Sequence, residues 1–112
     1  MTYKLTVRQG PNVTREKFTD LNDAIAAMER RAKDIRADGP LEARKVFREY
    51  EPAAQVAGRV EISTGSLLRS GREAGIDVMG DGMLVPYKGG FRRSELDPGS
   101  DGPFEVVRRA LT

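Results

Sequence analysis

The side chains of this chain that could do chemistry are carboxylates, hydroxyls, lysines and arginines, because it contains no histidine and no cysteine. Serine or cysteine nucleophiles paired with histidine, imidazole zinc sites, iron-sulfur clusters and redox thiols each need one of the missing types. Ser63, Thr64 and Ser66 carry hydroxyls suited to a nucleophile, but no lysine base stands at helical spacing from them. We interpret this segment as a polar turn and predict no catalytic residue.

Two pairs of carboxylates have spacings that suit acid-base chemistry or metal binding. Glu61 and Asp77 lie on predicted neighbouring strands, and paired carboxylates can act as general acid and base when one stays protonated. Each is flanked by apolar residues in an alternating segment, so we expect both to point into solvent and to pair with Arg59 or Arg72. Asp77 and Asp81 match a fragment of a calcium loop that lacks most of its ligands. The sequence therefore predicts no metal and no cofactor.

The segment from Lys88 to Arg93 is the strongest candidate for a binding site. Its two glycines let backbone amides converge, its arginines can grip phosphate bidentately, and Phe91 could stack on a base. The alternative is a glycine turn in which Phe91 returns to the core and the charged side chains are solvated. We take Lys88, Arg92 and Arg93 as the candidate anion or partner contacts. Neither glycine-rich phosphate-binding fingerprint is present.

Alternating and helical apolar patterns predict the first elements. Residues 3–8 and 13–18 form a hairpin whose second strand lies at an edge of the sheet. A long helix follows, capped by Thr19 or Asp20 and ended at Gly39-Pro40. Its apolar stripe consists of Leu21, Ile25, Met28, Ala32 and Ile35.

The second half of the chain predicts a β meander. Ten of the twelve glycines lie between residues 58 and 102, a density that suits tight turns between short strands. Residues 56–62 form a strand, and residues 41–50 are ambiguous between strand and helix. We interpret residues 41–50 as containing a strand that pairs with residues 56–62 in a second hairpin.

A third hairpin and a terminal helix complete the predicted elements. Gly80-Asp81-Gly82 supplies the turn of the hairpin. Because Pro86 cannot donate to a ladder, the second strand of this hairpin should be an edge or carry a bulge. Pro103 begins a short C-terminal helix whose apolar stripe consists of Phe104, Val107 and Leu111.

These elements predict a single α+β domain over residues 1–112. An antiparallel, hairpin-built sheet of five or six strands packs on the long helix, and the short C-terminal helix is a second cover. Adjacent apolar residues at Val46-Phe47 and Met83-Leu84-Val85 place apolar side chains on both faces of their strands. We therefore expect a homodimer formed through the uncovered face.

Charge is balanced along the chain, with 19 basic and 17 acidic residues and a net charge of +2. Basic residues are interspersed with acidic ones, so we do not expect nucleic acid to bind with useful affinity. Apolar runs are only a few residues long, so we expect no membrane contact and no signal peptide. A cytoplasmic location follows by default.

The first 36 residues resemble in outline the hairpin-plus-helix heads of phage integrase arm-binding domains. In those domains a short polar sheet lies on DNA and one helix backs it, which implies a DNA-contacting role for the hairpin. The resemblance covers a third of the chain, has no diagnostic motif and assigns no family. It rests on the helix entry at residues 18–21 and on Lys4, Arg8, Arg15 and Lys17, among which Glu16 intervenes.

The whole sequence predicts a noncatalytic interaction or assembly module that acts by surface complementarity. The alternative is a nucleic-acid-binding accessory domain that uses the amino-terminal hairpin or residues 88–93. A small-molecule-binding protein, or an enzyme that needs neither histidine nor cysteine, is the third hypothesis.

Overall fold

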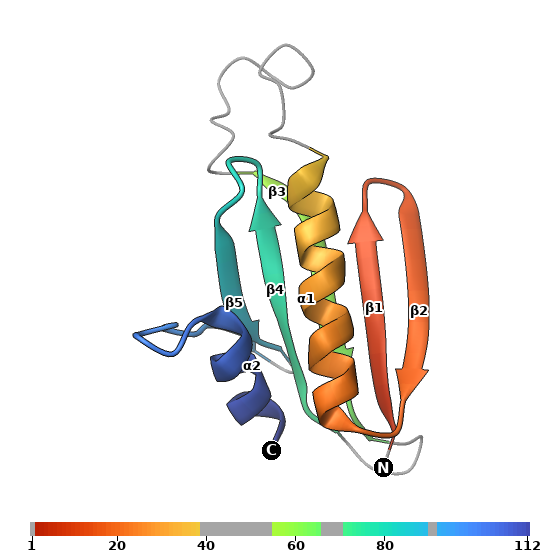
Figure 1. Cartoon of the computed structure of the whole chain (residues 1–112). Coiled ribbons are helices and arrows are strands. Elements are labelled where there is room, and N and C mark those ends of the chain that lie inside the picture. The colour runs from red at the N-terminus through yellow and green to blue at the C-terminus, as the bar shows by residue number, and fades with distance from the viewer. Residues whose placement is uncertain (1, 39–54, 66–70, 90–91) are drawn as a thin grey trace.

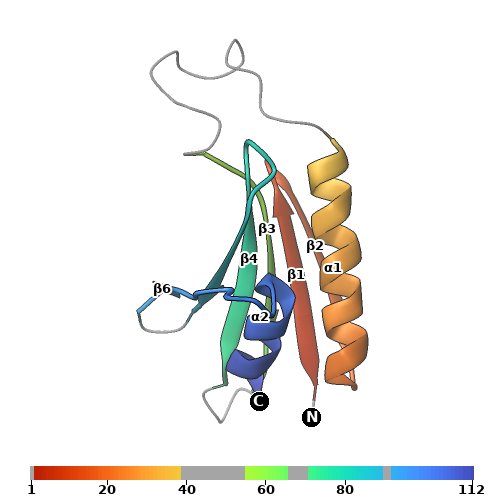
Figure 2. The same ribbon diagram turned by 60° about the vertical axis from the view of Figure 1, so that its left-hand side comes forward.

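A six-stranded antiparallel sheet in the order β2-β1-β3-β4-β5-β6 forms the frame of the molecule, with both helices on one face (Figures 1 and 2). The computed structural model describes residues 2–38, 55–65, 71–89 and 92–112. The six strands and two helices of these residues confirm the predicted α+β class. They are β1 Tyr3–Gln9, β2 Asn12–Phe18, α1 Leu21–Ala37, β3 Val56–Ser63, β4 Glu73–Met79, β5 Leu84–Lys88, β6 Ser94–Glu95 and α2 Pro103–Leu111.

The hairpin of β1 and β2 alternates as predicted. Leu5 and Val7 are buried beneath α1, so the residues between and beside them point to the opposite face. Gly10 makes the turn with a φ of 59°, the left-handed region that glycine enters without strain. Among the described strands β2 pairs with β1 alone, which confirms the predicted edge position of the second strand.

Helix α1 begins at a side-chain cap and packs on the sheet through the predicted stripe. The Asp20 carboxylate accepts hydrogen bonds from the backbone N–H groups of Asn22, at 2.6 Å, and Asp23, at 3.3 Å. The predicted stop at residues 39–40 lies outside the described residues. The buried residues of the helix are Ala24, Ile25, Ala27, Met28, Ala32 and Ile35, and Leu21 packs against them while partly exposed.

Gly58 of β3 lies against Ile35 of α1. A Cβ atom there would lie 2.8 Å from Cδ1 of Ile35 and 3.1 Å from the carbonyl oxygen of Arg8, so a larger residue would force the Ile35 side chain to shift. Strand β3 pairs with β1 on one side and β4 on the other. The predicted pairing of residues 56–62 with residues 41–50 is therefore wrong, because both edges of β3 are already filled. Residues 41–50 themselves lie outside the described part of the chain.

The hairpin of β4 and β5 turns at Gly80-Asp81-Gly82, as predicted. The Asp81 carboxylate accepts the backbone N–H of Met83 at 2.9 Å, and Gly82 has a φ of 91°. Pro86 does not interrupt pairing with β4, because its backbone faces the other neighbour, where its carbonyl accepts the N–H of Leu96 at 2.9 Å. The register with β6 includes only the two residues after Pro86, so β5 has no described strand partner on that side before the proline.

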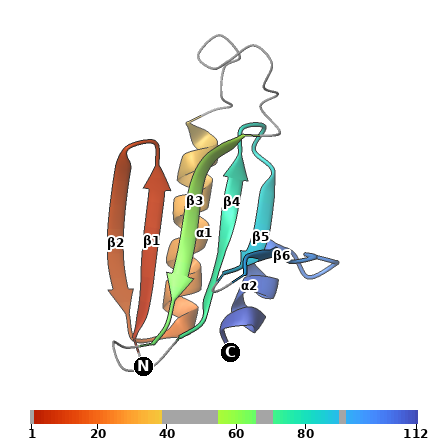
Figure 3. The same cartoon turned by 180° about the vertical axis from the view of Figure 1, so that it is seen from behind.

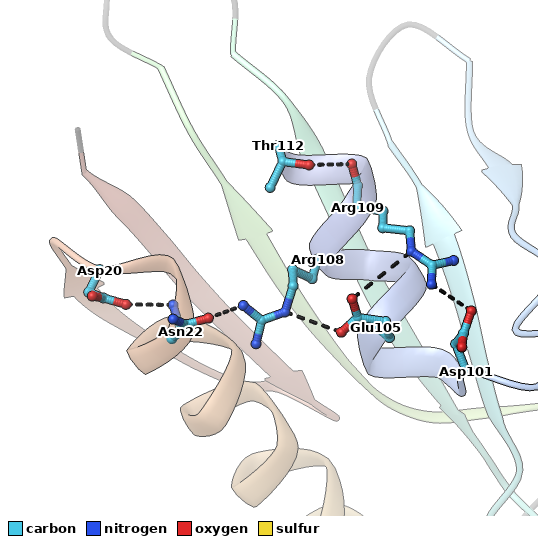
Figure 4. A network of polar contacts seen from close by, with 7 residues as sticks. All are labelled: Asp20, Asn22, Asp101, Glu105, Arg108, Arg109 and Thr112. Carbon is cyan, nitrogen blue, oxygen red and sulfur yellow. Dashed lines mark hydrogen bonds and ion pairs between the residues drawn. The ribbon is translucent and has the colours of Figure 1, made fainter.

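Helix α2 joins the core through its predicted stripe and is tied to the start of α1 (Figure 4). Val107 and Leu111 are buried, and Phe104 packs beside them. The Arg108 guanidinium donates to the side-chain oxygen of Asn22 and pairs with Glu105 on its own helix at 3.3 Å. Helices α1 and α2 thus form one cover over the sheet.

Candidate functional site

The opposite face of the sheet carries the candidate site. Neither α1 nor α2 covers it, as the view from behind shows (Figure 3). We call it the helix-free face. Its side chains alternate with the buried core residues of β1, β3 and β4, so it is built from residues that sequence patterning assigns to solvent.

A cluster of interacting polar side chains occupies the β3–β5 part of this face. Asp77 on β4 is only 2% exposed although it is an aspartate. Its carboxylate accepts a hydrogen bond from Nε of Arg59 at 2.7 Å and forms an ion pair with Arg93, which arrives from beyond β5. We name Arg59, Glu61, Asp77, Tyr87 and Arg93 the polar cluster.

Tyr87 fills the middle of the polar cluster. Its ring lies over Gly75 on the neighbouring strand, where an added Cβ atom would come within 2.7 Å of the tyrosine hydroxyl. That hydroxyl donates to the Glu61 carboxylate at 2.7 Å. The guanidinium carbons of Arg59 and Arg93 stand 5.3 and 4.3 Å from the ring centroid, within cation–π range. The absence of a side chain at Gly75 is what makes room for this packing.

The electrostatics of the polar cluster keep Arg59 charged and Tyr87 neutral. The hydrogen bond to Asp77 raises the pKa of Arg59 further above neutrality. Burial, followed by the hydrogen bond to Glu61, raises the pKa of Tyr87 well above its usual value. Tyr87 therefore stays a neutral hydrogen-bond donor at physiological pH, and a phenol held in this state is a poor general acid and no base. The cluster is suited to holding the sheet face together.

The sequence prediction for the two carboxylates was right about the pairing of Asp77 with Arg59 and wrong about the solvation of Asp77. Arg59 is the partner of Asp77, as expected, but Asp77 is buried because Tyr87 and Arg93 cover it. Glu61 is half-buried and is bound to Tyr87. The alternation of β4 indicated that Asp77 leaves the core. This alternation could not indicate that side chains from β5 and from the segment after it would cover Asp77.

The three predicted anion contacts do not converge in the structure. Arg93 lies over Tyr87 and is ion-paired with Asp77. Lys88 is exposed at the end of β5 and is in register with Ala74, a core residue, so its side chain lies on the other face of the sheet. Arg92 is exposed. Residues 90–91 lie outside the described part of the chain.

Two of the remaining chemical candidates, Thr64 and Asp81, have structural roles, and Ser63 is the last residue of β3. The Thr64 hydroxyl accepts the backbone N–H of Arg72 at 2.9 Å, and Asp81 is used by the hairpin turn. Ser66 lies outside the described residues. Over the described ranges, no three metal-ligating side chains come together. None of the helices that the structure describes is long and apolar enough to cross a bilayer.

A basic surface occupies the other part of the helix-free face. Its four cations are evident in the sequence, where Glu16 stands among them, and their separation from Glu16 was not predicted. The register of β1 and β2 places all the basic residues of the hairpin on this face, and all are exposed. We name this surface the basic hairpin face. None of these side chains forms an ion pair with another described residue. It consists of Lys4, Arg8, Arg15 and Lys17.

The single acidic residue of the hairpin points the other way. Glu16 is opposite Leu5, on the side of α1, where its carboxylate lies 3.0 Å from Arg31. Arg31 also donates to the hydroxyl of Thr14 at 2.9 Å. Charges that alternate along β2 are therefore segregated in space. The period-two alternation of strand side chains held this signal, because residues 15 and 17 share one face and residue 16 has the other.

The basic hairpin face places like charges beside one another. Lys4 is directly opposite Lys17, and Arg8 is directly opposite Arg59 of the neighbouring β3. Directly opposed like charges destabilise a sheet. Acidic groups of this face begin only at β3, where Glu61 is engaged by Tyr87. The hairpin thus forms a positive edge beside a charge-compensated centre.

An open groove of about 790 Å³ lies on the helix-covered side, near the turn between β4 and β5. Ile35, Val78, Met83 and Leu84 give it an apolar lining, with Arg36 among the polar residues at its wall. Arg36 donates from Nε to the carbonyl of Gly82 at 3.0 Å. The lining brings together no pair of groups that could act as acid and base.

Comparisons with known proteins return no relative of this chain. No family model, no curated protein and no solved structure matches it.

Proposed function

We propose that this protein is a noncatalytic interaction module whose basic hairpin face binds an acidic partner by charge complementarity. The observation that carries the proposal is the segregation of charge in the hairpin: four exposed cations on one face and Glu16 on the other. Lys88 lies on the other face of the sheet and Arg93 is already bound to Asp77, so neither belongs to the basic hairpin face.

The energetic cost of this arrangement supports a binding role. Lys4 and Lys17 repel one another across the strands in the free protein. An acidic partner would offset this repulsion, because its negative groups would attract both lysines. A surface that served stability alone would gain from a carboxylate at either position, so the retained cations favour recognition.

The polar cluster supports a noncatalytic role. Its carboxylates are occupied by arginines and by a tyrosine hydroxyl, and its tyrosine is held neutral. Its hydrogen bonds and ion pairs link β3, β4 and β5, and so support the sheet beside the hairpin that carries the cations. A preorganised binding surface loses less conformational entropy on association.

Salt-gradient elution from heparin and binding to polyglutamate test the proposal with a charge-matched pair of variants. Arg15→Gln/Lys17→Gln removes two charges from the basic hairpin face, and Arg30→Gln/Lys33→Gln removes the same two residue types from exposed positions of α1. We expect the hairpin variant to elute at clearly lower salt than the wild type and the α1 variant to elute close to it. Equal losses in both variants, or none in either, would overturn the proposed function.

We also propose self-association as a homodimer, supported by apolar exposure at one end of the sheet. Val56 is 44% exposed and Met83 is 61% exposed. Both lie next to Met79, which is in register with Val56 and donates its backbone N–H to the carbonyl of Met83. The strand positions Leu84 and Val85 contribute less, because both are half-buried.

A further inference from the structure

We infer that the acidic partner of the basic hairpin face is double-stranded nucleic acid, contacted through its phosphate backbone. The inference rests on the proposed function and names its ligand class. Lys4 and Arg8 lie on β1 and Arg15 and Lys17 on β2, so the cations form two parallel rows. Strand geometry spaces the rows about 5 Å apart and the cations on each row about 7 to 13 Å apart.

The composition of the surface favours phosphate over an acidic protein. Protein interfaces draw their binding energy from buried aromatic, methionine and arginine anchors set among apolar neighbours. On the helix-free face of β1 and β2 the only apolar side chain is Val13, which is 38% exposed. The face offers Thr6 and four cations besides, a set that matches a regular row of phosphates. Arginine can bind phosphate through two hydrogen bonds and lysine through its point charge.

The absence of a stacking surface favours a duplex over a single strand. Single-stranded nucleic acid is held by bases that stack on exposed aromatic rings. Of the aromatic residues that the structure describes, Tyr87 alone lies on the helix-free face, and it is 1% exposed. Tyr3 and Phe18 share the opposite side and pack against the core. The face is therefore built to touch the backbone, and the duplex is the nucleic acid with the higher backbone charge density.

The same composition disfavours an anionic membrane. Interfacial binding combines basic residues with apolar side chains that enter the lipid boundary. Val13 is the sole apolar side chain that this part of the face presents. The flat row of extended-strand cations suits a rigid polyanion better than a fluid one.

The expectation that nucleic acid would not bind rested on basic and acidic residues being interspersed. That premise holds along the chain but not on this face, because Glu16 points toward Arg31 and away from the cations. Local charge, not the net charge of +2, sets the attraction within a Debye length.

Counterion release makes the inference quantitative. If all four cations contact phosphates, the logarithm of the duplex association constant should fall with the logarithm of salt concentration with a slope of about −3.6. Affinity then drops roughly 100-fold between 50 and 200 mM salt. Removing two cations should halve the slope and reduce the drop to about 10-fold.

The experiment is a fluorescence-anisotropy titration of the full chain with a labelled 20-bp DNA duplex of mixed sequence at four salt concentrations. The same measurement is made with the single strand of that duplex and with phosphatidylserine vesicles. Arg15→Gln/Lys17→Gln is compared with Arg30→Gln/Lys33→Gln, and circular dichroism establishes that both variants are folded. We expect micromolar duplex binding at 50 mM salt, the steep slope for wild type and α1 variant, and the halved slope for the hairpin variant.

Four results would overturn the inference, and each leads to its own conclusion. Single-strand binding as tight as duplex binding would assign the face to single strands, and vesicle binding without duplex binding would assign it to membranes. Duplex binding that both variants lose equally would remove the basic hairpin face as the binding site, and no duplex binding at 50 mM salt would remove nucleic acid as the ligand. If heparin or polyglutamate retention still depends on the hairpin in any of these cases, the proposed function survives; if it does not, both fail.

Discussion

Asp77 shows how a single residue organises the helix-free face. Its carboxylate is buried yet shared by two guanidiniums, and those guanidiniums flank the ring of Tyr87. A buried carboxylate is tolerated only when it is paired and hydrogen-bonded. The ion pairs with Arg59 and Arg93 therefore tie the segment after β5 onto the centre of the sheet.

Removing this carboxylate should loosen the fold. Asp77→Ala leaves two arginines without their shared partner, and we expect the free energy of unfolding to fall by about 1–3 kcal/mol. The value stays below that of a fully buried pair because the arginine side chains are 35% and 42% exposed. Urea denaturation followed by circular dichroism measures the change. Asp34→Ala, at an exposed position of α1, is the control and should change stability by less than about 0.5 kcal/mol.

Tyr87 makes the free energy of unfolding fall at alkaline pH. Its pKa is raised in the folded protein, so the folded state keeps the phenolic proton at pH values where the unfolded chain has released it. The stabilisation is complete below pH 10.0, the ordinary value, and is lost as pH rises above it. The difference in phenolate absorbance between wild type and Tyr87→Phe should appear only together with unfolding. A Tyr87 phenolate that forms near pH 10.0 in folded protein would contradict this prediction.

At the scale of elements, α1 packs on the sheet through its apolar stripe, and the hairpin packs on α1 through the alternate apolar residues of β1. Ile25 is 5% exposed within the core that α1 shares with β1 and β3, whereas the next residue, Ala26, is exposed. Neighbouring positions of one helix therefore differ fully in environment. This contrast permits a matched test of what the stripe contributes.

An aspartate in the stripe should destabilise the protein strongly. Ile25→Asp places an unpaired carboxylate among apolar side chains, and we expect a loss of about 3 kcal/mol or more. Ala26→Asp introduces the same group on the solvent side and should cost less than about 1 kcal/mol. Thermal and urea denaturation compare the two. Similar melting temperatures for both variants would show that Ile25 is not a core residue.

The hairpin should show opposite responses of stability and binding to one substitution. Lys17→Glu replaces a like-charge pair with an attractive pair opposite Lys4, and we expect a gain in unfolding free energy of about 0.2–1 kcal/mol. The same change should weaken retention on heparin. Lys33→Glu changes the net charge equally but breaks the pair of Lys33 with Glu29 on α1, so it should not stabilise. A destabilised Lys17→Glu variant would refute the assigned charge repulsion.

At the scale of the whole molecule, the two faces of the sheet differ in what they can contact. Both helices lie behind the sheet in Figure 3, which leaves the other face open. The covered face buries the core between the sheet and the two helices, and the helix-free face carries the polar cluster and the basic hairpin face. An edge strand with free backbone groups can pair with a second copy. On β2, however, Arg15 and Lys17 would then lie beside the same cations of the second copy and repel them. This favours self-association through the end of the sheet where Val56 and Met83 are exposed.

Light scattering behind size exclusion tests the proposed homodimer. We expect a mass near twice 12.4 kDa at micromolar concentration, falling toward 12.4 kDa on dilution. Met83→Ser should weaken the dimer without loss of folding, because the side chain is 61% exposed. A mass of 12.4 kDa throughout a tenfold dilution series would show a monomer.

Local periodicity in the sequence determined the elements of this protein. Residues 3–8 and 13–18, the apolar stripe of α1 and the terminal helix all follow from patterns of two or about 3.6 residues, which report which side of an element is buried. The charged side of the hairpin was predictable in the same way. Residues 15 and 17 alternate with residue 16, although net composition concealed the segregation.

Tertiary structure alone decided how those elements meet. One of the two neighbours of β3 is β1, which lies more than fifty residues earlier in the chain. No local pattern encodes a pairing between such distant segments. The burial of Asp77 likewise depends on Tyr87 and Arg93, which arrive from another strand and from beyond it. Alternation specifies that a side chain leaves the core. What covers it there depends on contacts between segments far apart in the chain, and these form only when the sheet assembles.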